Sequence, residues 1–278
     1  MIRNICRMLF SYCFLAVSGA LFLAAANQSI AAPVFRYSLP QSWAGPPATV
    51  VEDLSPADND GILAGTPALS ATIPPGADPT TQSLDSHTGG IQTAATGLLN
   101  NAAIAAAGGF RYDVSFLWDG GAGSFPVQKI IDYAGTEFLQ LENIDAGNGT
   151  AELRFGFNDE ADLGPSAAVS ANQWYTVAAV FDTQGNTVAG DGSLAGLATL
   201  TVNGNSFSEA VSKSNFGDSL NRRIGVGVFS VGGGIIELEG LVHDPAVSLI
   251  PEPATVWLLL IAVAALLWRK NRAVARSA

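Results

Sequence analysis

Cysteine is missing from the part of the chain that we expect to fold, residues 33–250. Both cysteines, Cys6 and Cys13, lie near the amino terminus, as do the two methionines. The folded region therefore has no disulfide, no thiol nucleophile and no cysteine-ligated metal. Histidine is scarce as well, and neither His87 nor His243 has a second histidine at a metal-ligand spacing. Zinc would need more donors than these residues offer along the chain, so we expect no zinc site.

Basic residues are also few between positions 32 and 250. That stretch holds seven of the 13 Lys and Arg residues but 23 of the 24 Asp and Glu residues, which gives it a net charge of about −16. Such a surface repels nucleic acid and anionic lipid and offers no basic patch to either. We therefore expect no nucleic-acid partner. The charge is compatible with solubility in an extracellular matrix and with divalent cations.

Helical periodicity is nearly absent from this stretch, whereas apolar residues alternate with period 2 in two segments. Their apolar faces consist of Phe110, Tyr112, Val114, Phe116 and Trp118, and of Ala151, Leu153, Phe155 and Phe157. Further strands are predicted at 34–38, 127–133, 137–144, 173–181, 198–202, 223–231 and 235–243. Residues 52–92 are mostly turns, and residues 93–107 fit either a short helix or a strand. Short strands separated by Gly, Asn and Asp turns predict an all-β sandwich.

The amino terminus has the pattern of a secretory signal peptide. Arg3 and Arg7 form a basic region, residues 9–26 are apolar, and small residues follow up to Ala31. Cleavage by signal peptidase is expected after Ala31 or after Ala26. Residues 1–31 are therefore left out of the fold prediction, and the protein is expected to be exported.

The carboxyl terminus combines three features in a fixed order. Pro251, Glu252 and Pro253 come first, and 13 uninterrupted apolar residues, 256–268, follow. A basic tail then ends the chain with Arg269, Lys270, Arg272 and Arg276. The apolar run would be about 20 Å long as a helix, shorter than the roughly 30 Å of a bilayer core, so its length alone also allows a buried core helix. The tail favours a membrane helix at about 254–268 with a cytoplasmic carboxyl end.

This order resembles the PEP-CTERM sorting signal of Gram-negative bacteria, which would comprise residues 251–278. In that family a membrane-embedded exosortase cleaves near the Pro-Glu-Pro motif and removes the tail. The resemblance implies a precursor that is transiently anchored in the inner membrane. It also implies a mature form at the cell surface or in the extracellular matrix.

The middle of the chain resembles the LamG-like jelly roll of the concanavalin A-like lectin/glucanase group. Residues 174–182, Trp-Tyr-Thr-Val-Ala-Ala-Val-Phe-Asp, are similar to a strand of that family, and Trp174 is expected in the core. Residues 200–204, Leu-Thr-Val-Asn-Gly, are similar to its hairpin, where Asn-Gly also favours a type I′ turn. His243-Asp244 comes later than the family's acidic pair. The resemblance implies an antiparallel jelly-roll sandwich over residues 33–250.

Two groups of oxygen donors are candidate sites. Asp58, Asn59 and Asp60 precede a glycine and could bind calcium, although an Asx turn needs the same residues without a metal. Glu237 and Glu239 would lie about 7 Å apart on one strand face, within reach of glycosidase geometry. The third acid that laminarinase-type enzymes of this fold group carry is missing, so no catalytic residue is predicted.

We therefore expect a binding or structural module of the extracellular polymer, with extracellular polysaccharide as its ligand. A glycoside hydrolase on the same fold is the alternative. Aromatic residues such as Trp43, Tyr133 and Tyr175 could stack on sugar rings, but packing in the core is their commoner use.

Overall fold

The computed structural model describes residues 32–46, 48–123, 125–133, 137–157, 164–214, 223–231 and 234–250. Residues Ala32–Ile250 form one compact unit. The predicted signal peptide, the Pro-Glu-Pro motif and the basic tail lie outside the described residues. Within the described ranges no helix is both long and apolar enough to cross a membrane.

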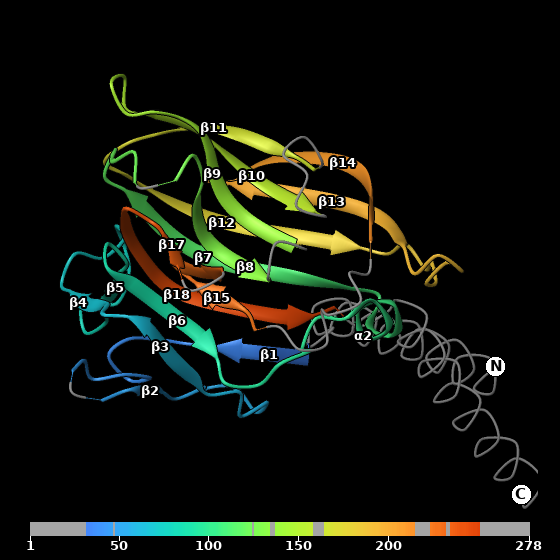
Figure 1. Cartoon of the computed structure of the whole chain (residues 1–278), viewed down its shortest axis with the longest axis horizontal. Helices are drawn as coiled ribbons and strands as arrows, with labels where there is room; N and C mark the ends of the chain where they lie inside the picture. Colours follow the sequence, from blue (N-terminus) through green and yellow to red (C-terminus); the bar gives the residue numbers. More distant parts are fainter. Residues whose placement is uncertain are drawn as a thin grey trace, which may run out of the picture. The chain divides into compact units, whose positions relative to one another are not determined.

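Two eight-stranded antiparallel sheets make up most of the unit (Figure 1). The first, called here the β7 sheet, has the spatial order β14 (Asn205–Lys213), β13 (Leu194–Val202), β12 (Gln173–Asp182), β7 (Gly109–Trp118), β18 (Gly240–Leu249), β5 (Ser83–Asp85) and β4 (Ala68–Ser70), with β1 (Ala32–Arg36) also paired to β18. The second, called the β8 sheet, has the order β11 (Ser166–Ser170), β10 (Thr150–Phe157), β9 (Glu137–Asp145), β8 (Gln128–Tyr133), β15 (Gly225–Val226), β6 (Gly89–Thr93), β3 (Gly61–Gly65) and β2 (Val50–Val51). A separate hairpin joins β16 (Val228–Val231) to β17 (Gly234–Glu237). The predicted antiparallel jelly-roll sandwich is confirmed.

The alternating segments supply the core, as predicted. On β7 the side chains from Phe110 to Trp118 alternate between buried and more exposed, and the inward residues of β10 are likewise buried. Their rings meet between the sheets, where Phe110 and Phe155 have centroids 5.9 Å apart and Phe157 and Phe181 5.3 Å. Each fully buried ring of this kind stabilises the fold by about 1.5–3 kcal/mol. Trp43, Tyr133 and Tyr175 are also buried, so core packing is their use here.

The predicted core position of Trp174 is wrong. On β12 the inward side chains are Tyr175, Val177, Ala179 and Phe181, and Trp174 lies on the outer face, half-buried. Its indole meets the His243 ring edge-on, with centroids 6.4 Å apart. The outer face of this strand alternates between exposed and half-buried residues. The strand is nevertheless central, lying between β13 and β7.

Local turn chemistry accounts for several connections. Asn203 and Gly204 form the predicted two-residue hairpin between β13 and β14, both with positive φ (47° and 84°), as a type I′ turn requires. Residues 93–107, for which the sequence left helix and strand open, contain α2 (Asn101–Ala107). The Asn100 side chain caps its first turn by accepting from the Ala103 amide, and Gly108 ends it with φ of 88°.

The predicted strand at 235–243 is two strands. β17 ends at Glu237 and β18 begins at Gly240, where the Gly240 amide donates to the Leu238 carbonyl. A Cβ on Gly240 would lie 2.0 Å from the Leu117 carbonyl oxygen, so only glycine lets the chain enter the β7 sheet here. Residues 223–231 are divided in the same way, between β15 and β16. The expected turn region at 52–92 contains the short strands β3 to β6.

Candidate functional site

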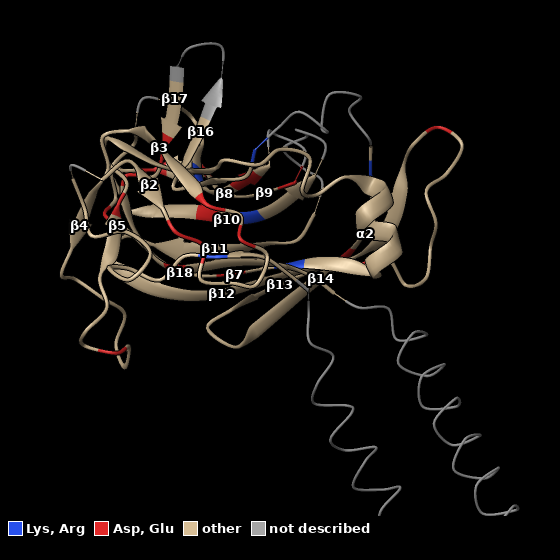
Figure 2. Ribbon diagram, turned by 90° about the horizontal axis from the view of Figure 1, so that it is seen from below, with Lys and Arg blue, Asp and Glu red and all other residues tan. Residues whose placement is uncertain are grey.

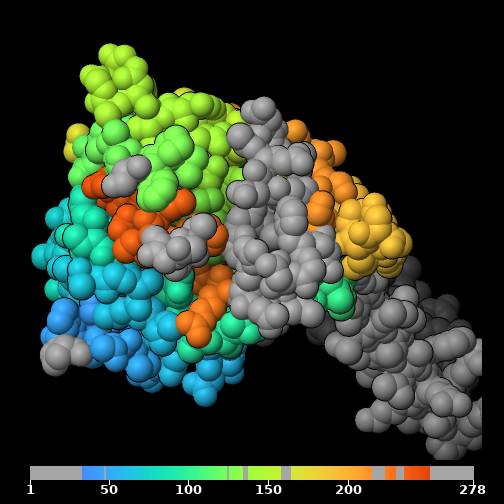
Figure 3. Space-filling view, in the orientation of Figure 1, coloured from blue at the N-terminus to red at the C-terminus, as the bar shows by residue number. Residues whose placement is uncertain are grey.

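Three connections between different sheets meet at one end of the sandwich. Residues 86–88 lead from β5 to β6, residues 119–127 from β7 to β8, and residues 238–239 from β17 to β18. They lie together because β18 pairs with both β5 and β7. In the space-filling view the orange-red residues near 240 accordingly lie between cyan residues of the amino-terminal strands and green residues beyond β7 (Figure 3).

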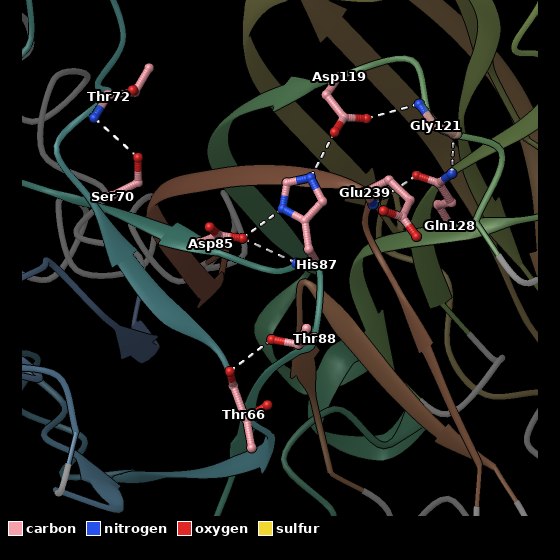
Figure 4. Close-up of polar contacts among 10 residues, drawn as sticks. All are labelled: Thr66, Ser70, Thr72, Asp85, His87, Thr88, Asp119, Gly121, Gln128 and Glu239. Carbon is pink, nitrogen blue, oxygen red and sulfur yellow. Dashed lines mark hydrogen bonds and ion pairs between the residues drawn. The ribbon is translucent and has the colours of Figure 1, made fainter.

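These connections bring four titratable side chains together, called here the end cluster: Asp85, His87, Asp119 and Glu239 (Figure 4). The Nδ1 atom of His87 lies 2.6 Å from Oδ1 of Asp85, and its Nε2 atom lies 2.7 Å from Oδ2 of Asp119. One ligand atom from each of His87, Asp119 and Glu239 lies within 4.8 Å of the other two. The side chains of His87, Asp85 and Asp119 are 35–40% exposed, so a solute can reach them.

Buried groups fix the backbone beneath the cluster. The indole N–H of Trp118 and the amide Nε2 of Gln128 both donate to the Gly121 carbonyl, at 2.9 and 2.7 Å. The Oε1 atom of Gln128 accepts from the Glu239 amide at 2.9 Å, and Gln128 is only 1% exposed. The Gly121 amide in turn donates to Oδ1 of Asp119. The backbone positions of Asp119 and Glu239, which follow or precede distant strands, are therefore fixed without a ligand.

Negative charge predominates in the end cluster. Three carboxylates surround one imidazole, and in the described part of the chain the Glu239 carboxylate has no hydrogen-bond or ion-pair partner. Burial by itself would lower the pKa of His87, but the hydrogen bonds to Asp119 and Asp85 outweigh it and raise that pKa. Both ring nitrogens face carboxylates, so the protonated ring donates to both. A divalent cation could take the place of one of these protons.

A shallow depression of about 440 Å³ adjoins the end cluster. It is lined by Ala122, Gly123, Phe125, Pro126, Asn143 and Ile144. The Phe125 side chain is 41% exposed, one of few large apolar side chains so accessible in the described residues. A Cβ on Gly123 would lie 3.2 Å from Nε2 of Gln128 and 3.5 Å from Cγ of Glu239. One glycine thus separates the aromatic depression from the acids.

The predicted calcium turn is organised around another residue, Asp53, which is buried. Asp53 accepts from the amide of Asn59 at 2.8 Å, and the Asp53 amide donates to Oδ1 of Asp60 at 3.0 Å. The Asn59 side chain donates to the Val34 carbonyl at 2.7 Å. These bonds span six or more residues and tie the loop to Asp53 and to the backbone of β1, whereas the Asx turn here is made by Asp53 itself, whose Oδ1 accepts from the Ser55 amide at 2.8 Å. Calcium at Asp58, Asn59 and Asp60 stays a prediction, and an ion there would compete with these bonds.

Glu237 and Glu239 are not a pair on one strand, contrary to the prediction. Glu237 ends β17 opposite Val228, whereas Glu239 lies in the connection to β18 and belongs to the end cluster. The combination of His87 with Asp119 could not be recognised in the sequence, because the two residues are 32 positions apart and metal donors are recognisable there only at close spacings. The spacing Asp85-Ser86-His87 was the local signal, since it places a carboxylate and an imidazole on the same side of an extended segment.

A second group of charged residues is buried on and beside the β8 sheet. It consists of three ion pairs, called here the buried pairs: Lys129–Asp132 at 2.9 Å, Lys213–Glu137 at 2.5 Å, and Arg154 with Glu142. Gln140 connects two of them by accepting from Lys129 at 2.6 Å and donating to Glu142 at 3.1 Å. Every cation here has its own acid. Among the residues that the structure describes, basic (blue) segments are few beside the acidic (red) ones (Figure 2).

No family model matches the chain, and no curated protein matches it. Among solved structures, domain 4 of AbnA, a GH43 extracellular arabinanase from Geobacillus stearothermophilus in complex with arabinotriose, is 13% identical and has a TM-score of 0.49. The match covers 81% of this chain and 97% of that one. The binding domain of botulinum neurotoxin DC in complex with SialylT is 11% identical with a TM-score of 0.47, covering 84% and 51%. This chain thus spans about half the length of the neurotoxin domain, and function has to be argued from its own residues.

Proposed function

We propose that the mature domain is a non-catalytic binding module for glycan, and that the ligand lies in the depression at Phe125. The observation that carries the proposal is the exposed Phe125 ring in a depression that is also lined by Gly123, next to Glu239. A sugar ring has an apolar face of C–H groups that packs on an aromatic ring, and hydroxyl groups around its edge that need acceptors. The Phe125 ring would pack on the apolar face of the sugar, and the carboxylates of Glu239 and Asp119 would accept hydrogen bonds from its hydroxyl groups.

The negative charge of the domain favours neutral glycans over anionic ones. Residues 32–250 carry a net charge of about −16, so an anionic polysaccharide would be repelled at low ionic strength. Neutral glycans are not repelled in this way, and their hydroxyl groups can donate hydrogen bonds to the Glu239 carboxylate, which has no partner among the described residues. Neutral extracellular polysaccharide is therefore the ligand class that we propose.

The absence of catalysis in this proposal rests on the placement of the candidate acids. Glu237 and Glu239 belong to different elements, and the acid that lies near Glu239, Asp119, is hydrogen-bonded to His87. A glycoside hydrolase remains the alternative outcome of the experiment below.

Export and processing form the second part of the proposal. We propose that signal peptidase removes residues 1–31, that residues 254–268 hold the precursor in the inner membrane, and that an exosortase-type protease cleaves near Pro251-Glu252-Pro253. Intact-mass measurement on protein from its native envelope tests this. The expected product lacks residues 257–278, and a product that retains the Arg-rich tail would exclude the sorting proposal.

A glycan array with neutral and anionic polysaccharides tests the binding function. Retention of neutral glycans without release of reducing ends supports the module. Release of reducing ends, abolished by Glu239→Gln, would make the protein an enzyme. Failure to retain any glycan would contradict the proposal.

A further inference from the structure

The end cluster presents three metal-ligating atoms of mixed type. His87 offers a ring nitrogen, and Asp119 and Glu239 offer one carboxylate oxygen each, all within 4.8 Å of one another. They come from three separate connections, so no single loop conformation places them together. An imidazole with two carboxylates is a donor set that proteins use for divalent metals.

The spacing of these atoms is close to that of a coordination shell. Ligand atoms about 2.1 Å from one ion lie roughly 3.0–3.4 Å from each other in octahedral or tetrahedral geometry. The His87 and Asp119 atoms are at 2.7 Å and would have to separate slightly, while the Glu239 atom lies within 4.8 Å of both and would adjust to the ion. Rotation of exposed carboxylates is enough for both movements, because the backbone beneath them is already fixed by Gln128 and Trp118.

Asp85 supplies the orientation that a ligating histidine needs. Its Oδ1 atom lies 2.6 Å from Nδ1 of His87, on the side of the ring away from Asp119. A carboxylate that accepts the N–H of one ring nitrogen fixes the tautomer and directs the other nitrogen to the metal. Glu239 adds the remaining feature, a carboxylate that has no competing partner in the described part of the chain.

We propose that His87, Asp119 and Glu239 bind one divalent first-row transition-metal ion of the zinc class, with Asp85 as the residue that positions His87. Nitrogen ligation distinguishes such ions from calcium and magnesium, which take oxygen ligands. Three protein ligands and half-exposed side chains leave at least one coordination position for water or a ligand hydroxyl. The site adjoins the depression at Phe125, but the proposal does not depend on glycan binding.

Cobalt(II) is the probe for this site, because its visible absorption reports the coordination shell. The protein is the full chain in detergent with Cys6→Ser and Cys13→Ser, which removes the thiols that would also bind metal. We expect one equivalent of Co²⁺, displaced by Zn²⁺ and not by an equal concentration of Ca²⁺. His87→Ala and Glu239→Gln should each weaken binding by at least about 100-fold, and Asp85→Asn by about 10- to 100-fold.

Matched controls separate ligation from general effects of charge or folding. His243→Gln changes the other histidine, and Glu209→Gln removes an exposed carboxylate on β14, so both should keep Co²⁺ affinity within about threefold. Glu239→Gln removes no side-chain hydrogen bond to the residues that the structure describes and should keep the far-UV circular dichroism of the parent protein. Phe125→Ala should bind Co²⁺ normally even if it loses glycan, which distinguishes failure of this proposal from failure of the proposed function. No stoichiometric Co²⁺ binding by the parent protein, or unchanged binding by His87→Ala, would overturn the inference.

Discussion

The end cluster and the buried pairs use the same kinds of side chains in opposite ways. In the buried pairs Lys129, Lys213 and Arg154 each contact an acid, and Lys213 and its partner Glu137 are at most 2% exposed. In the end cluster three carboxylates share one imidazole, and the side chains of His87, Asp85 and Asp119 are 35–40% exposed. Removing a charge from water is costly, so buried charges have to be matched.

The difference in burial and pairing separates charges that serve the fold from charges that are available to a ligand. A buried ion pair has nearly no net charge, and its carboxylate offers no open coordination position to a ligand. A half-exposed surplus of negative charge is stabilised by adding a cation or a hydrogen-bond donor from outside. We therefore assign structural roles to the buried pairs and a binding role to the end cluster.

Breaking a buried pair should have the largest effect on stability. Lys213→Met leaves the Glu137 carboxylate without its cation in the interior and should lower the free energy of unfolding by about 3–5 kcal/mol. Urea denaturation measures it. The double variant Lys213→Met, Glu137→Leu should recover part of that loss, because no uncompensated charge remains. A single-variant loss below about 1 kcal/mol would mean that the pair is solvated.

Removing a ring on either side of β12 tests which face is buried without changing any charge. Phe181→Ala should cost about 3–5 kcal/mol, because the ring is buried against Phe110 and Phe157. Trp174→Ala should cost about 1 kcal/mol or less, because the indole lies on the outer face. Chemical denaturation of both variants decides between them, and a larger loss for Trp174→Ala would reverse the assigned faces.

Neutralising the end cluster should have little effect on stability in metal-free buffer. Exposed ion pairs contribute about 0–1 kcal/mol, so Asp85→Asn and Glu239→Gln should stay within about 1 kcal/mol of the wild type. With saturating Zn²⁺ the wild type should gain thermal stability by mass action, and Glu239→Gln should not. Differential scanning calorimetry with and without Zn²⁺ measures both. If Zn²⁺ stabilised the wild type and Glu239→Gln equally, the end cluster would have no binding role that distinguishes it from the buried pairs.

The smallest expected effect is a pH dependence caused by His243. Burial lowers the pKa of His243, with a partial opposing contribution from Asp244. The unfolded chain therefore takes up a proton at about pH 6.5, before the folded chain does. The stabilisation from keeping this ring neutral is complete above about pH 6.5 and is lost as the pH falls through the folded pKa. His243→Gln should reduce the loss of stability between pH 7 and pH 5 in metal-free urea titrations, and an unchanged slope would contradict this.

The parts of the fold that could be predicted are those encoded by neighbouring residues. Alternation marked β7 and β10, and Asn203-Gly204 marked a hairpin, because both patterns act within a few residues. Trp174 was misplaced because apolar residues occupy both faces of its strand, and the pattern there does not say which face is inward. The end cluster needs topology, since His87 lies 32 residues from Asp119 and Gln128 lies 111 from Glu239. Only the pairing of β18 with β5 and β7 brings them together.

The affinity of two matched variants for a glycan retained on the array tests the binding surface most directly. Phe125 and Phe207 are equally exposed at 41%, but Phe207 lies on the edge strand β14, away from the depression at Phe125. Isothermal titration calorimetry should show that Phe125→Ala weakens binding by about tenfold or more, equivalent to about 1.4 kcal/mol, while Phe207→Ala changes it by less than about twofold. Equal affinity of Phe125→Ala and the wild type, or a larger loss in Phe207→Ala, would contradict the account.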